Sequence, residues 1–249
     1  MTRIVLALAG LLFAAAALAQ TADSCQVADG VSQPGFPLPH VRAAIENKQL
    51  DIVVLGTASS ALAGPGASTK AYPARFESEL KAKLPEVAVR VTTYARPRQT
   101  APDMAKEISG ILPRDKPALL VWQTGTGDAI RAIDPDSFRA ALEDGVTAAR
   151  AEDSDIVLMN MQYSPRTETM IALGPYLEVM RFVALQNEIN LFDRFAIMKY
   201  WNEVGTFDLS TATKKTDLGE RVHECIGRLL AEFILDSAKL TVSGDKDFH

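Results

Sequence analysis

Residues 51–60 read Asp-Ile-Val-Val-Leu-Gly-Thr-Ala-Ser-Ser. The first five form a short apolar run rich in β-branched residues, which is typical of a strand buried on both faces, and Gly56 ends it. The small residues that follow favour a tight turn, and they place two hydroxyls, Ser59 and Ser60, directly beyond the strand. Such a turn can present a serine oxygen for nucleophilic attack. The alternative is that the serines only cap the next helix.

Similar apolar runs recur along the chain, and amphipathic segments separate them. We expect further strands at 87–91, 118–122, 155–160 and 190–192, and helices at 72–84, 101–112, 136–150, 173–188, 195–201 and 217–235. Strands that alternate with helices of this length imply right-handed crossovers and a parallel sheet covered on both faces. No repeat or linker interrupts the pattern. Residues 20–249 are therefore expected to form a single domain, with residues 20–49 as an N-terminal arm.

The first 19 residues have the features of a signal peptide. Arg3 gives a positive start, an apolar run extends over residues 4–18, and Ala17-Leu18-Ala19 matches the small-x-small pattern of a cleavage site. The run is short for a membrane span, although a retained anchor is the alternative. We expect a mature protein that starts at Gln20, is periplasmic or secreted, and has no stable membrane insertion after processing.

Two cysteines, Cys25 and Cys225, remain in the expected mature chain. A pair of cysteines in an oxidising compartment is most simply one disulfide, here between the N-terminal arm and the last helix. The alternative is two reduced, buried thiols. With the cysteines paired and the three histidines scattered, no metal site is expected. No dinucleotide or Walker spacing is present, so no cofactor is expected either.

The chain has a formal net charge of −5 and contains no basic block, so a nucleic-acid partner is not expected. Among the histidines, His40 lies in the proline-rich arm and His249 ends a polar tail. His223 follows Glu220 by three residues and Asp217 by six. Because a catalytic histidine needs a carboxylate that fixes its tautomer, His223 is the expected base if a serine is the nucleophile. A surface histidine on a helix is the alternative.

Taken in order, these segments resemble the SGNH/GDSL hydrolase family from Asp51 to Leu235. The matching features after the serine turn are Tyr72-Pro73 at the start of a helix, the block of residues 122–128 (Trp-Gln-Thr-Gly-Thr-Gly-Asp), residues 157–165 and His223. The resemblance implies a three-layer α/β/α sandwich with a flavodoxin-like parallel sheet. It also implies hydrolysis of an ester or acetyl ester.

The chain departs from the family's motifs at several positions. The family's nucleophile stands two residues after glycine, where this chain has Ala58. One extra residue in the turn gives Ser59, which we prefer, whereas alignment back from Gly64 gives Ser60. The family's Asp-x-x-His motif is represented by residues 220–223, with Glu220 in place of the aspartate.

Two further departures concern the oxyanion hole. The resemblance assigns it to the backbone N–H of Arg98 and to Gly127, which stands where the family has asparagine. Loss of one oxyanion donor costs roughly 100- to 1000-fold in rate. Arg96 and Arg98 are also candidates to guide an anionic substrate, or else are solvated surface charges.

The sequence thus predicts an exported serine esterase that acts on a small ester or an O-acetylated carbohydrate of the envelope. The alternative is a catalytically inactive binding module for envelope glycans on the same scaffold.

Overall fold

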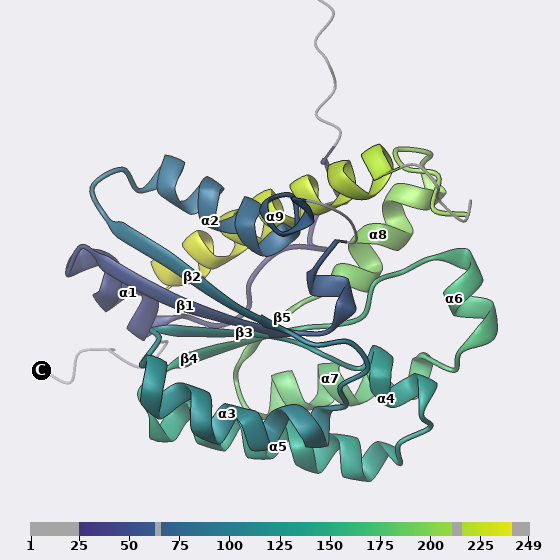
Figure 1. Ribbon diagram of the computed structural model, residues 1–249, viewed down its shortest axis with the longest axis horizontal. Helices are drawn as coiled ribbons and strands as arrows, with labels where there is room; N and C mark the ends of the chain where they lie inside the picture. Colours follow the sequence, from purple (N-terminus) through teal and green to yellow (C-terminus); the bar gives the residue numbers. More distant parts are fainter. Residues whose placement is uncertain (1–24, 63–65, 211–215, 241–249) are drawn as a thin grey trace, which may run out of the picture.

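A single parallel sheet forms the centre of the protein, as the computed structural model shows (Figure 1). The structure describes residues 25–62, 66–210 and 216–240, and the expected signal peptide at 1–19 lies outside them. The strands are β1 (Gln49–Gly56), β2 (Ala88–Ala95), β3 (Leu119–Gln123), β4 (Asp155–Met159) and β5 (Asn190–Phe192). They lie in the order β2-β1-β3-β4-β5, and all neighbours are parallel. This is the flavodoxin-like order, so the predicted fold class is confirmed.

Helices cover both faces of the sheet and make it a three-layer sandwich (Figure 1). One face carries α2 (Tyr72–Lys83) and α9 (Thr216–Lys239), and the other carries α3 (Ala101–Asp115), α5 (Pro135–Ala151) and α7 (Gly174–Gln186). The helix α8 (Arg194–Glu203) follows β5 directly. Every residue of β3 and β4 is buried, as expected for strands covered on both sides, whereas the edge strand β2 is partly exposed.

Several short helices were not predicted. They are α1 (Pro39–Glu46), α4 (Thr126–Ile130), α6 (Pro165–Met170) and the 3₁₀ turns Ala58–Ser60 and Ala67–Thr69. Helix α1 lies inside the segment expected to be an irregular arm. It buries Val41, whose backbone N–H donates to the Asp155 carboxylate at 2.9 Å. A helix of eight residues or fewer spans about two turns, which is too short for its apolar spacing to be recognised.

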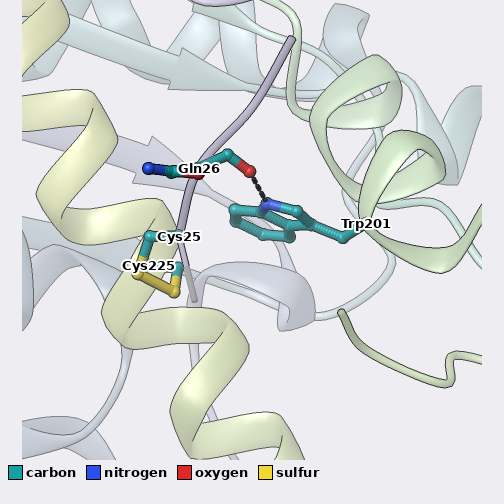
Figure 2. The surroundings of a disulfide bond; sticks show 4 residues. All are labelled: Cys25, Gln26, Trp201 and Cys225. Atoms are coloured by element: carbon teal, nitrogen blue, oxygen red, sulfur yellow. Dashed lines mark hydrogen bonds between the residues drawn. A yellow bond between two sulfur atoms is a disulfide. The ribbon is translucent and has the colours of Figure 1, made fainter. Parts of the chain in front are cut away.

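The predicted disulfide is present (Figure 2). Cys25 and Cys225 are joined with a Cα–Cα distance of 5.1 Å, across a sequence separation of 200 residues. Beside it, the carbonyl oxygen of Gln26 accepts a hydrogen bond from the Trp201 indole at 2.9 Å. The N-terminal arm is therefore fixed to both α8 and α9.

Close packing of α9 on α2 sets the position of His223. A Cβ atom on Gly227 would lie 2.6 Å from the Cβ of Arg75 and 2.8 Å from the backbone nitrogen of Phe76, so only glycine allows this approach. His223 lies four residues earlier, one turn along the same helix. It therefore faces the first turn of α2.

Candidate active site

The carboxyl ends of the strands border a pocket of about 450 Å³. Its polar lining comes from the segments that follow β1, β4 and β5 and from α9. These polar residues include Ser59, Gln162, Ser164, Arg166, Arg194, Ser210 and His223. Its apolar lining includes Leu62, Met198, Leu209, Leu218 and Val222. Ligands of open α/β sheets bind at this edge, so the pocket lies at the position expected for an active site in this fold.

The two candidate serines have different surroundings. Ser59 is half-buried and lines the pocket, and its hydroxyl donates to Gln123 Oε1 at 3.0 Å. Ser60 is 1% exposed and does not line the pocket. Its Oγ hydrogen bonds with the Tyr72 hydroxyl at 3.0 Å and donates to Gln123 at 2.9 Å. Of the two, Ser59 is therefore the serine that a ligand in the pocket can reach.

The Gln123 side chain, at the end of β3, organises the serine turn. Besides the two serine hydroxyls, its Oε1 accepts from the backbone N–H and the hydroxyl of Thr57, at 3.0 and 3.1 Å. The turn also depends on Gly56, because a Cβ there would lie 2.0 Å from Ser60 Oγ and 3.2 Å from Gln123 Oε1. The sequence pointed to the glycine but gave no role to the glutamine.

His223 is 8% exposed and is held by a backbone donor. Its Nδ1 accepts a hydrogen bond from the Tyr72 N–H at 2.9 Å. Burial, together with the positive charge of Arg194, lowers the pKa of His223 to about 3. The imidazole is therefore neutral near pH 7, and the lone pair of Nδ1 is already used, so its proton is on Nε2.

The expected carboxylate partners of His223 are not placed beside it. Glu220 forms an ion pair with Lys70 at 2.7 Å, and Asp217 is exposed. Within the ranges described above, no recorded hydrogen bond joins a carboxylate to His223. The resting site thus brings Ser59 and His223 to one pocket without the carboxylate of the expected triad.

The two expected oxyanion residues, Arg98 and Gly127, lie outside the pocket lining. Gly127 packs on the loop before α3, since a Cβ there would lie 2.1 Å from the carbonyl oxygen of Gln99. Asp128, beside it, has a structural role: its carboxylate accepts the Ala101 N–H at 2.8 Å, and burial raises its pKa. Arg96, one of the candidates to guide an anionic substrate, pairs with Glu107 on the surface.

Arg194 was not predicted, although it is central to the pocket. It is 2% exposed, and its Nη1 donates to the Ser59 carbonyl oxygen at 3.2 Å and to Ser59 Oγ at 3.4 Å. Its Nη2 donates to Gln162 Oε1 at 3.0 Å, and the guanidinium lies over the Tyr72 ring, 5.7 Å from the centroid. The sequence signal that could have found Arg194 is its position directly after the last strand. It was missed because the next helix was expected to start only at residue 195.

The profile of the Non-GDSL lipase-like family matches residues 24–240. The chain belongs to this family. Membership in the Non-GDSL lipase-like family agrees with the sequence of the turn, in which Thr57-Ala58 replaces the Asp-Ser of the GDSL motif. No sequence among the curated proteins matches the chain significantly.

Several solved structures resemble this Non-GDSL lipase-like protein. TesA is 20% identical, with a TM-score of 0.59 over 74% of this chain and 99% of TesA. A putative lipolytic protein of the G-D-S-L family from Desulfitobacterium hafniense is 18% identical, with a TM-score of 0.55 over 72% of this chain and 98% of that chain. A variant of Axe2, an acetyl-xylooligosaccharide esterase from Geobacillus stearmophilus, is 18% identical, with a TM-score of 0.54 over 77% and 95%. These likenesses confirm the SGNH-hydrolase fold.

Proposed function

We propose that the protein hydrolyses esters, with Ser59 as the nucleophile. The observation that carries the proposal is the position of the Ser59 hydroxyl, which borders the same pocket as His223 and lies 3.4 Å from the Arg194 guanidinium. A positive charge at this distance stabilises an alkoxide relative to the hydroxyl and so favours attack on an acyl carbon.

His223 is the proposed acceptor of the Ser59 proton. In the resting site the lone pair of Nδ1 accepts the hydrogen bond from the Tyr72 N–H. The ring must therefore release that bond and turn before it can act as a base. Catalytic hydrogen bonds often align only when substrate is bound. Breaking a buried hydrogen bond costs about 1–3 kcal/mol, which slows the reaction roughly 5- to 150-fold. We therefore propose a slow esterase. The proposed donor to the oxyanion is the backbone N–H of Ser59.

The proposed substrate is a small ester or an O-acetylated carbohydrate. A pocket of about 450 Å³ suits a small ligand, and the similar protein Axe2 is an acetyl-xylooligosaccharide esterase. The disulfide supports the proposal that the protein is exported, because such bonds persist in oxidising compartments. In the described part of the chain, no helix has the length and apolar character needed to cross a membrane.

One observation favours a second candidate function, a binding module without turnover. The imidazole lacks a free lone pair in the resting site, so no side chain seen there is ready to accept the Ser59 proton. If the ring never releases the Tyr72 N–H, the pocket binds its ligand and does not cleave it.

Hydrolysis of 4-nitrophenyl acetate by matched serine variants tests the proposal. We expect Ser59→Ala and His223→Ala to abolish turnover, and the double variant to be no worse than either, because nucleophile and base act as a unit. Ser60→Ala is the control: it should lower stability by about 1–3 kcal/mol, since Tyr72 and Gln123 lose a buried partner, but keep activity. Turnover that survives Ser59→Ala would refute the assignment. No turnover by the folded wild type would favour the binding module.

A further inference from the structure

The Arg194 guanidinium is a buried positive charge without a negative partner. All of its recorded contacts are with neutral groups: the Ser59 carbonyl and hydroxyl, the Gln162 amide and the Tyr72 ring. In the described residues no carboxylate lies within 4 Å of it. Its Nε is buried and has no hydrogen-bond partner. A buried ion left in this state is costly unless another charge compensates it.

The rest of the pocket does not supply that charge. None of the residues that line it is aspartate or glutamate, and a second arginine, Arg166, is exposed at its edge. Burial lowers the pKa of Arg194 to about 10, so the guanidinium remains protonated near pH 7. His223 is neutral there and adds no charge of either sign. The pocket therefore presents two positive charges and no negative one.

We propose that the pocket selects esters that carry an anionic group, and that Arg194 binds this group. The inference rests on the proposed esterase function, which it deepens by naming the substrate class. Arginine suits this role because its planar guanidinium binds carboxylate and phosphate oxygens with short, charge-assisted hydrogen bonds. Since Nη1 lies 3.4 Å from Ser59 Oγ, the bound anion must be close to the scissile ester.

Three acetyl esters that differ in charge test the proposal: 3-carboxyphenyl acetate, phenyl acetate and 3-(trimethylammonio)phenyl acetate. The wild type should hydrolyse the anionic ester with a kcat/KM roughly tenfold or more above that of the neutral one, and the cationic ester should be the poorest. Arg194→Gln should lower turnover of all three esters, because Ser59 Oγ loses the nearby positive charge, and should lower it most for the anionic ester, so that the preference disappears. Arg139→Gln, on the surface of α5, is the matched control and should change none of the three.

Two variants guard against a failure to fold. Arg194→Lys keeps the positive charge and should keep part of the preference. Arg166→Gln removes the exposed arginine and should lower kcat/KM roughly threefold for the anionic ester only. Equal losses for all three esters in Arg194→Gln would show that Arg194 acts on the Ser59 oxygen alone and does not bind the anionic group, and would overturn the proposal.

Binding provides a readout that does not depend on turnover. Calorimetric titration of Ser59→Ala should show binding of 3-hydroxybenzoate and much weaker binding of phenol, and the Ser59→Ala/Arg194→Gln protein should bind neither well. Binding of 3-hydroxybenzoate without hydrolysis of any ester would support the anion site and refute the esterase. Hydrolysis of the three esters at equal rates, with no binding of 3-hydroxybenzoate, would support the esterase and overturn the anion site.

Discussion

Replacing His223 with asparagine should make the protein less sensitive to acid. The asparagine Oδ1 can accept the Tyr72 N–H in place of Nδ1, so the variant removes a titrating ring and keeps its hydrogen bond. The pKa of His223 is about 3 in the folded protein, against about 6.5 in an unfolded chain. Because the folded pKa is the lower one, the unfolded chain takes up the proton first as the pH falls.

The size of the effect follows from these two pKa values. The contribution of His223 to the free energy of unfolding is complete above about pH 6.5 and declines as the pH falls toward 3. At pH 4.5 the loss amounts to about 3 kcal/mol. Asp155 titrates in the opposite sense, because burial raises its pKa to about 6 and the folded protein gains a proton below that pH. This second effect is the same in both proteins and cancels in their difference.

Urea unfolding followed by tryptophan fluorescence can measure that difference. The two tryptophans, Trp122 and Trp201, are fully buried, so unfolding changes their surroundings. Between pH 7 and pH 4.5 the wild type should lose about 3 kcal/mol more than His223→Asn. Parallel losses, within about 0.5 kcal/mol, would show that the folded protein does not hold the ring neutral, and the reasoning on the site would fail.

Further predictions concern the turn and the disulfide. Gly56→Ala places a Cβ 2.0 Å from Ser60 Oγ, so it should destabilise the protein by about 1–3 kcal/mol and lower ester hydrolysis; thermal unfolding and the nitrophenyl assay measure the two effects. The control is Gly110→Ala on α3, where nothing lies within 4 Å of the added atom, and which should stabilise by up to about 1 kcal/mol. Replacing Cys25 and Cys225 with serine opens a loop of 200 residues and should cost about 3–5 kcal/mol, and an unchanged urea midpoint would count against a stabilising cross-link.

The strands could be predicted because burial on both faces leaves a clear pattern. The apolar runs at 118–122 and 155–160 correspond closely to β3 and β4, in which every residue is buried. The edge strand β2 continues to Ala95, whereas the prediction ended it at residue 91. The prediction stopped early because residues 92–94 are Thr-Thr-Tyr, which show no alternation of apolar and polar side chains. The short helix α1 depends on the contact of Val41 with Asp155, which is distant in sequence.

The site could be predicted only for residues whose place follows from their position in the sequence relative to a strand. Ser59 was accessible to this reasoning because it directly follows β1. The partners of His223 could not be predicted, because they depend on how α9 packs on α2. The Tyr72 N–H in the first turn of α2 donates to His223, and Glu220 forms an ion pair with Lys70 instead. The role of Arg194 depends on its burial in the assembled fold.

The nucleophile itself can be tested most directly by covalent trapping. A serine-reactive phosphonate should modify the wild-type protein once, and peptide mapping by mass spectrometry should place the adduct on Ser59. Ser59 is half-buried and borders the pocket, whereas Ser60 is 1% exposed and hydrogen-bonded to Tyr72 and Gln123. An adduct on Ser60, or an equal yield of adduct in Ser59→Ala, would contradict the account.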